Sequence, residues 1–424
     1  MPGILRSANV PPTISDNIAA LIIASTMLLG ACSATRPDVN ADDRYAAFDA
    51  MLVREPGHIG ALHHAARMAA AAGDGDRAMR YLDALATAGF DDALEPTDFL
   101  SLSGRHDYRA LAARLDVAAP MVGQAMLHAE THCLDVLPEG AAYDAKRGRF
   151  LMSSGRRRTV VAVDADGRCS ELVPSANGGL LSVLGMDVDA ATDTLWVASA
   201  AAPFMRDAES VEAGATSISR IDLATGRVVA TYAKTGPGLF NDLDLLADGR
   251  IAVTDSVAGT IYLLDPGAHS PKLLPLLPDA SFEGPNGIVA LAEGLLLVAD
   301  FNGLWLVDPA LGAPSKRRVA TPGDRYLGGI DGLARDGEDV IAIQNLVGRG
   351  RVWRFRVDTK DARVTELHLL LRQHPDLRNP TTGAVADRRF LFVADPNLQT
   401  FVDGAVTTAP DGHRGHRILS LPLP

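Results

Sequence analysis

The segments Phe240-Asn241-Asp242, Pro285-Asn286-Gly287 and Ile330-Asp331-Gly332 recur at an interval of 45 residues, and an apolar run follows each of them. A repeat of roughly 40 to 50 residues is typical of a β-propeller, in which each blade is a sheet of four short antiparallel strands. We therefore interpret each segment as the opening of a blade.

The same frame covers most of the chain and predicts a mainly β protein with six blades. Similar apolar hairpins follow Glu139-Gly140, Leu184-Gly185 and Thr382-Gly383, where blades one, two and six should begin. The chain ends after a third strand for blade six, at Arg417-Ile-Leu-Ser-Leu. We expect residues 122–127 to supply the missing outer strand and to close the ring.

The blade openings carry polar side chains that should meet on the propeller axis, because first strands line that axis. The four oxygen-bearing residues in register are Glu139, Asn241, Asn286 and Asp331. Two carboxylates and two amides suit a hard divalent cation, so calcium is expected first, with magnesium, manganese or zinc as the alternatives. The sequence therefore predicts one metal site at the mouth of the channel.

A second set of polar residues stands at the ends of the second strands and should face the same mouth. Its members are Asp255, Asp300, Asn345 and Asp395. Aspartates at such positions usually cap turns, and we expect that role for them, with ligand or metal contact as the alternative.

The blade-opening motifs resemble those of the senescence marker protein/gluconolactonase/luciferin-regenerating family, of which regucalcin is a member, and more distantly those of the paraoxonases. The matching motifs are Glu139-Gly140, Asn241-Asp242, Pro285-Asn286-Gly287 and Asp331-Gly332. Over residues 122–424 the resemblance implies a six-bladed propeller with one axial divalent metal that hydrolyses lactones or esters. It also implies that Glu139, Asn286 and Asp331 hold the metal, while Asn241 assists metal or substrate.

For a catalytic site, Asp331 is the expected base and Asn241 the second catalytic residue, with Asp255 or Asp300 as alternative bases. The substrate would be a small lactone or ester. The alternative function is a non-catalytic propeller that binds a ligand or a protein partner in the cell envelope. The pair Ala141-Ala142, where the family often has Pro and Trp, keeps this alternative open.

The start of the chain indicates export. Residues 18–29 form an almost wholly apolar run, of a length that suits a signal-peptide core better than a membrane span. The run ends in Leu29-Gly30-Ala31-Cys32, which resembles a bacterial lipobox. We expect a lipoprotein signal peptide over residues 1–31, lipidation of Cys32, and a location on the periplasmic face of the outer membrane. The alternative is an ordinary cleavage site.

Between a tether at residues 32–42 and the propeller at residues 119–424, residues 43–118 have a helical period. Small and large apolar positions around Gly73 match one tetratricopeptide-like hairpin. Because repeats need neighbours to bury a core, we favour a helical spacer over a module that binds a protein partner.

Composition limits the partners. The net charge of −12 and the lack of a basic cluster argue against nucleic acid, so the link to a membrane should be the N-terminal lipid alone. Cys133 and Cys169 are either free thiols or one disulfide.

Two long stretches follow the second strands of blades two and six, at residues 200–216 and 396–416. Long loops on a rigid scaffold often determine specificity. We expect Phe204, Met205 and Phe401 to help cover the channel mouth, with a plain surface insertion as the alternative.

Overall fold

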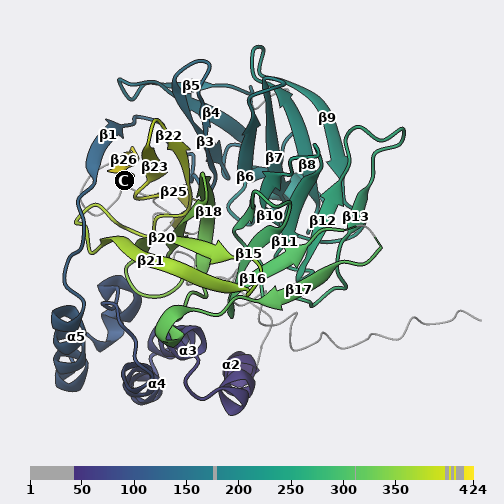
Figure 1. Cartoon of the computed structure of the whole chain (residues 1–424). Coiled ribbons are helices and arrows are strands. Elements are labelled where there is room, and N and C mark those ends of the chain that lie inside the picture. Colours follow the sequence, from purple (N-terminus) through teal and green to yellow (C-terminus); the bar gives the residue numbers. More distant parts are fainter. Residues whose placement is uncertain (1–42, 175–178, 311, 397–400, 403–404, 407–414) are drawn as a thin grey trace, which may run out of the picture.

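The computed structural model describes residues 43–424 except 175–178, 311, 397–400, 403–404 and 407–414. Cys32, the expected signal peptide and the tether lie outside these residues. The described chain forms six four-stranded antiparallel sheets, with helices on the N-terminal side of the propeller (Figure 1). The prediction of a mainly β, six-bladed propeller preceded by a small helical region is therefore confirmed.

Blades one to five each use four strands that are consecutive in the chain. Blade one is β2 (Ala141–Asp144), β3 (Arg149–Ser154), β4 (Thr159–Val163) and β5 (Cys169–Glu171). Blade two is β6 (Ser182–Asp189), β7 (Thr194–Ala200), β8 (Thr216–Asp222) and β9 (Arg227–Ala233). Blade three is β10 (Phe240–Leu245), β11 (Ile251–Asp255), β12 (Thr260–Leu264) and β13 (Leu273–Pro275). Blade four is β14 (Ile288–Ala290), β15 (Leu296–Asp300), β16 (Gly303–Asp308) and β17 (Ser315–Arg318). Blade five is β18 (Ile330–Asp336), β19 (Asp339–Gln344), β20 (Arg351–Asp358) and β21 (Arg363–Arg372).

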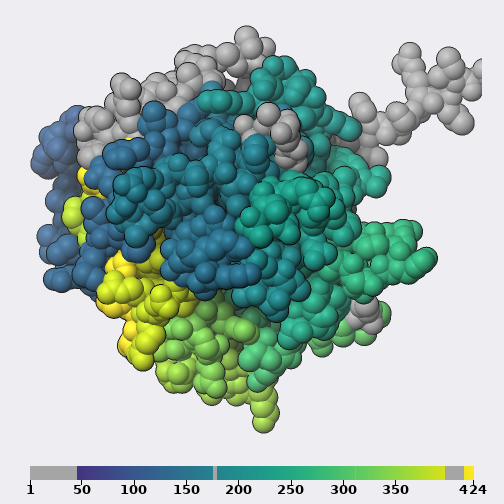
Figure 2. Space-filling model, turned by 90° about the horizontal axis from the view of Figure 1, so that it is seen from above, coloured from purple at the N-terminus to yellow at the C-terminus, as the bar shows by residue number. Residues whose placement is uncertain are grey.

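Blade six joins the two ends of the propeller. It consists of β22 (Gly383–Ala386), β23 (Arg389–Val393), β26 (Arg417–Pro422) and, outermost, β1 (Met126–Glu130). A two-stranded sheet of β24 (Phe401–Val402) and β25 (Ala405–Val406) stands between β23 and β26 in the chain. The strand β1 thus closes the ring. Figure 2 shows blue residues from the start of the propeller beside yellow residues from its end. The strand lies later than the expected residues 122–127, because Val122 instead forms a bridge with Arg372 of blade five.

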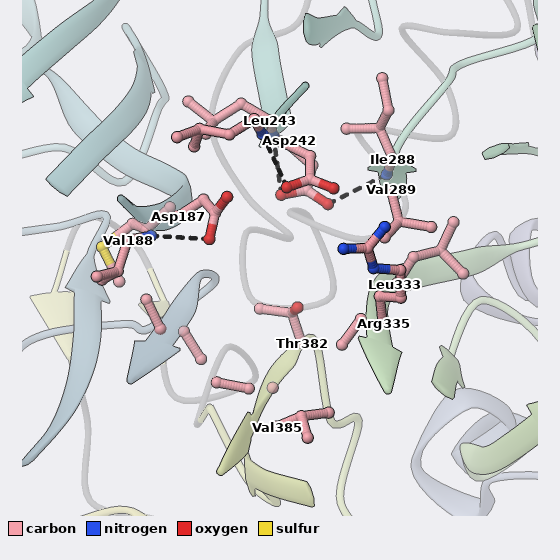
Figure 3. A pocket seen from close by; sticks show the side chains of 18 of the residues that line it. Asp187, Val188, Asp242, Leu243, Ile288, Val289, Leu333, Arg335, Thr382 and Val385 are labelled. Carbon is pink, nitrogen blue, oxygen red and sulfur yellow. Dashed lines mark hydrogen bonds between the residues drawn. The ribbon is translucent and has the colours of Figure 1, made fainter. Parts of the chain in front are cut away.

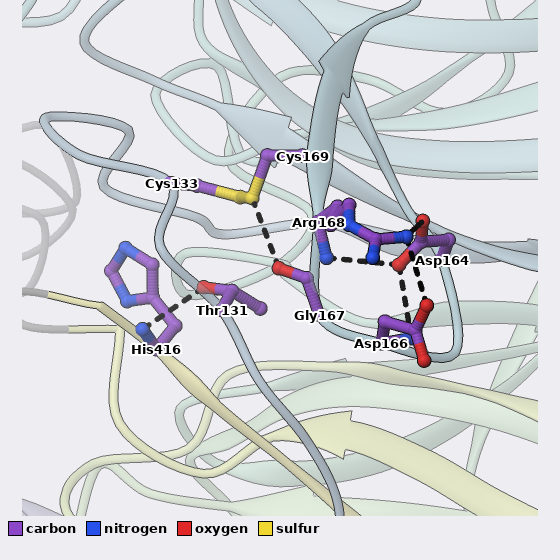
Figure 4. Close-up of a disulfide and its surroundings, with 8 residues drawn as sticks. All are labelled: Thr131, Cys133, Asp164, Asp166, Gly167, Arg168, Cys169 and His416. Carbon is purple, nitrogen blue, oxygen red and sulfur yellow. Dashed lines mark hydrogen bonds and ion pairs between the residues drawn. A yellow bond between two sulfur atoms is a disulfide. The ribbon is translucent and has the colours of Figure 1, made fainter.

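A disulfide between Cys133 and Cys169 secures this closure (Figure 4). Cys133 follows the closing strand β1, and Cys169 begins the outer strand of blade one. Next to it, the Thr131 amide donates to the His416 carbonyl oxygen at 2.8 Å. The disulfide, which the sequence left open, therefore joins the closing strand of the ring to blade one.

Glycine is needed at two of the blade openings because a side chain would not fit there. A Cβ built on Gly140 would lie 1.8 Å from the carbonyl oxygen of Leu184, and one on Gly332 would lie 2.5 Å from Thr382 Oγ1. Neither glycine has a positive φ. They are therefore needed for the close approach of neighbouring first strands and not for a turn.

The helical module (residues 43–118) contains α2 (Asp43–Arg54), α3 (Ile59–Ala71), α4 (Gly75–Thr87), η1 (Pro96–Leu102) and α5 (His106–Ala118). α3 and α4 form a hairpin with Gly73 at its turn, where φ is 77°. The module packs beside blades four and five (Figure 1). No helix in the described ranges has the length and apolar character of a membrane span.

Candidate functional site

Three of the expected site residues meet at one mouth of the channel. Asn286 Nδ2 donates to Asp331 Oδ1 at 2.6 Å, across the boundary between blades four and five. Asn345, one residue beyond β19, donates its Nδ2 to the other carboxylate oxygen of Asp331. Glu139 lies close enough to Asp331 for the two charges to repel each other. The Asp331 carboxylate is therefore the centre of the group.

The charged forms of the Glu139 and Asp331 carboxyl groups are disfavoured at this site. Burial, and then the nearby Asp331 charge, raises the pKa of Glu139 well above its ordinary value. Burial raises the pKa of Asp331 to about 7, although the hydrogen bonds from Asn345 and Asn286 lower it. Both side chains keep part of their surface exposed. In the described part of the chain, no hydrogen bond or cation reaches the Glu139 carboxylate.

Asn241 is held by a different contact. Its Nδ2 donates to Ser256 Oγ at 3.1 Å, and Ser256 Oγ donates to the Pro285 carbonyl oxygen at 2.6 Å. Because the Ser256 proton is committed to Pro285, the hydroxyl can only accept from Asn241. The Asn241 amide therefore turns its NH₂ group towards Ser256, and its Oδ1 stays available for a ligand. No hydrogen bond joins Asn241 to Glu139, Asn286 or Asp331 among the described residues.

The second set of polar residues divides into two kinds. Asp255 Oδ1 accepts backbone N–H groups from Leu239 and Ala258, at 2.9 and 3.0 Å. Asp300 Oδ1 accepts the N–H groups of Asn302 and Gly303, at 2.8 and 3.0 Å. Both aspartates thus cap turns, and their alternative role as the base stays a prediction. Asp395 contributes a backbone contact, from its carbonyl oxygen to His416 Nδ1 at 3.1 Å.

Asn345 is the exception in that set, because it contacts Asp331. It follows Asp331 by 14 residues, as Asp255 follows Asn241, and this spacing is the sequence signal that placed it at the mouth.

Charged side chains for which the sequence predicted no role line the deeper channel, a cavity of about 380 Å³ formed by all six first strands (Figure 3). They are Asp187, Asp242, Asp244 and Arg335. Burial and then the Asp244 charge raise the pKa of Asp187 well above its ordinary value. Burial also raises the pKa of Asp244.

Two of these deeper carboxylates accept hydrogen bonds from the backbone of blade four. Asp242 Oδ2 accepts the Ile288 N–H at 3.2 Å, and Asp244 Oδ2 accepts the Ala290 N–H at 2.6 Å. From the other side, Arg335 Nη1 donates to the Ala290 carbonyl oxygen at 3.1 Å. Backbone N–H and carbonyl groups at the edge of β14 are thereby hydrogen-bonded by the two flanking blades.

An apolar wall borders the polar mouth. Phe204, in the long stretch after β7, is buried in a cluster with Leu137, Leu184 and Leu239. Arg156 Nη1 donates to the Phe204 carbonyl oxygen at 3.1 Å, which holds this segment in place. Met205 is also buried. The Phe401 side chain lies outside the described part, and the covering role of this wall stays a prediction.

The mouth fits a hard divalent cation. Its donors are carboxylate and amide oxygens, and Asn345 Oδ1 is buried without a hydrogen-bond partner. No cluster of three or more His, Cys, Asp or Glu residues suited to a metal occurs in the described ranges, so the amides would have to complete the site. The fold and mouth define a six-bladed propeller with a polar axial site.

No protein-family model and no curated protein matches the chain. Similar solved structures include a gluconolactonase from Xanthomonas campestris, with 18% identity and a TM-score of 0.47 over 72% of this chain and 98% of that one. They include a luciferin-regenerating enzyme, with 13% identity and a TM-score of 0.47 over 71% and 96% of the two chains. They also include an aldose sugar dehydrogenase from Streptomyces coelicolor, with 17% identity and a TM-score of 0.47 over 72% and 99%. The neighbours thus include gluconolactonase-like and regucalcin-like propellers, and likeness at this level does not select among their activities.

Proposed function

We propose that this protein is a hydrolase of lactones or esters that uses a divalent cation, calcium first, at the mouth of the propeller channel. The observation that carries the proposal is the pair Glu139 and Asp331. Both are acidic, both have raised pKa values, and Glu139 has no counter-charge in the described chain. A divalent cation would remove their mutual repulsion.

Glu139, Asn286 and Asp331 would hold the ion, and Asn241 would add its Oδ1 to the ion or to the substrate. A divalent cation at such a site polarises a carbonyl group and acidifies a bound water. Asp331, fixed by two amide N–H donors, would accept the proton of the attacking water and return it to the leaving alkoxide oxygen. One C–O bond of the lactone or ester would break and one would form.

We also propose that the protein is exported and lipid-anchored at Cys32 in the periplasm. The Cys133–Cys169 disulfide supports an oxidising compartment. The Cys32→Ala variant should lose its acyl group and leave the detergent-requiring membrane fraction, which palmitate labelling would measure. A labelled Cys32→Ala protein would contradict the assignment.

A binding protein without catalysis is the second candidate, and one observation favours it. A cavity of about 1050 Å³ lies between the helical module and blade four, with Arg318, Arg325 and Tyr326 in its lining. Such a cavity is large enough to bind a small molecule away from the channel mouth.

The deciding experiment is elemental analysis of the purified mature protein, followed by a lactone and aryl-ester panel with and without chelator. We expect bound calcium and hydrolysis that chelator abolishes and added calcium restores. Hydrolysis that resists chelation would contradict the metal role, and calcium binding without turnover of any substrate would favour the second candidate.

A further inference from the structure

The β19–β20 loop (residues 345–350) begins at the channel mouth and then packs against the helical module. Its first residue, Asn345, donates to the Asp331 carboxylate. The following two, Leu346 and Val347, are 6% and 0% exposed, because the module covers them. A residue of the candidate site is thus covalently continuous with the interface between the two parts of the protein.

The module holds this loop through apolar and polar contacts. Leu346 belongs to a buried cluster with Phe48 and Met51 of α2. Val347 belongs to the core that α3, α4 and α5 form. The Gly348 N–H donates to His63 Nε2 at 3.3 Å, so the backbone of the loop is also fixed.

A second link from the module reaches Gln344, the residue before Asn345. Arg351, which is 2% exposed, donates its Nη1 to Asp91 Oδ1 of the module at 2.7 Å. Its Nε donates to Gln344 Oε1 at 2.7 Å. Gln344 Nε2 in turn donates to the Gly328 carbonyl oxygen at 2.7 Å. Asn345 therefore lies between two segments that the module restrains.

Without the module, the loop would keep only hydrogen bonds to the propeller, such as those from the Leu346 N–H to the Gly329 carbonyl oxygen at 3.3 Å and from Arg349 Nη1 to Gln373 Oε1 at 3.2 Å. Gly348 and Gly350 have φ values of 73° and 87°, so the loop contains two positions of high backbone freedom. Leu346 and Val347 would face water. Few buried contacts and flexible glycines are the properties of segments that open locally.

We propose that the helical module positions Asn345 against Asp331 and thereby sets the affinity of the channel mouth for its ion. The part that concerns the ion rests on the proposed function, whereas the restraint of the loop does not. Asn345 is a positioning residue, since it acts through Asp331. The helices are then a support of the site, in addition to any role as a spacer or a partner surface.

The test compares Phe48→Ala with Phe150→Ala. Both phenylalanines are almost fully buried, and Phe150 lies in blade one at the end of β3 away from the mouth. In Phe48→Ala we expect the amide hydrogens of residues 346–348 to exchange roughly tenfold faster, and calcium affinity measured by calorimetry to fall roughly fivefold. Phe150→Ala should change neither quantity.

A second pair of variants separates positioning from general damage. Asn345→Ala should lower calcium affinity by itself, and Phe48→Ala added to it should lower the affinity no further, because the module would act through Asn345. If Phe48→Ala does not fold, His63→Leu, which removes the acceptor for the Gly348 N–H, replaces it in both experiments.

Unchanged exchange in residues 346–348 would overturn the proposal, and so would faster exchange with unchanged calcium affinity. Additive effects of Phe48→Ala and Asn345→Ala would overturn it as well. If the parent protein binds no calcium, the proposed function fails, and the exchange data still decide whether the module restrains the loop.

Discussion

The two halves of the axial channel contain the same acidic residue types in different surroundings. In the deeper half, Asp242 and Asp244 accept backbone N–H groups of the neighbouring blade. At the mouth, within the described chain, the Asp331 carboxylate accepts only from side-chain amides, and the Glu139 carboxylate has no hydrogen-bond partner. The deeper carboxylates of Asp242 and Asp244 thus join neighbouring blades, whereas those at the mouth accept no backbone N–H in the described chain.

The two groups of acids differ in the kind of donor that they accept from. A backbone N–H is fixed by the scaffold, so Asp242 and Asp244 tie neighbouring blades together. A side-chain amide can exchange its NH₂ for its oxygen by rotation about χ2, so the Asn286 amide could also turn its oxygen towards a cation.

The largest expected effect tests the mouth against the deeper half. Glu139→Gln and Asp331→Asn each remove a charge with little change in volume, so calcium affinity should fall on the order of 100-fold. Asp187→Asn makes the same change in the deeper half and should leave the affinity intact. Calorimetry would measure all three. An equal loss in Asp187→Asn would remove the distinction between the halves.

The second prediction concerns stability. Asp244→Ala leaves the Ala290 N–H without its acceptor and should lower the free energy of unfolding by about 1–3 kcal/mol. Asp166→Ala, in an exposed hairpin, should change it by less than about 0.5 kcal/mol. Urea denaturation gives both values. If the two variants are equally stable, the deeper carboxylates do not support the blade boundary.

The third prediction is a pH dependence. The folded pKa values of Asp187 and Asp244 lie above the unfolded ones, so the protonated pair favours the folded state most fully below pH 4. That contribution is lost as pH rises through the folded pKa values. Asp187→Asn removes the coupling, so the variant should gain stability relative to the parent as pH rises above about 4. Denaturation at several pH values measures the difference, and a constant difference would refute the coupling.

The smallest expected effect concerns the orientation of Asn241. Ser256→Ala removes the acceptor that fixes its amide, so calcium affinity should fall roughly threefold to tenfold. Ser256→Thr keeps the hydroxyl and should retain the parent affinity. A comparable loss in both variants would point to packing as the cause.

The sequence predicted the ring and its mouth because both depend on a repeated position. Every blade opens at the same place in its repeat, and Gly140 and Gly332 mark the contact between first strands. Glu139, Asn286 and Asp331 stand in that register, and the structure brings them close together.

Contacts between blades were harder to predict. Asp187 and Asp244 belong to different blades, and nothing in either blade's own pattern shows that the two carboxyl groups meet. The closing strand was expected a few residues early, because residue pattern alone did not show that Val122 pairs with blade five. The spacing of Cys133 and Cys169 says nothing of their reach, so the sequence left their bond open.

The outer strand of blade six comes from the start of the propeller, and this has a consequence for the order of assembly. β1 is the first strand of the ring along the chain and its partner β26 is the last, so β1 would stay unpaired until both ends of the propeller have folded. The Cys133–Cys169 bond spans only 36 residues and can form early, which would keep the waiting strand beside blade one. The ring would then close by a short local movement and not by a search of the whole chain.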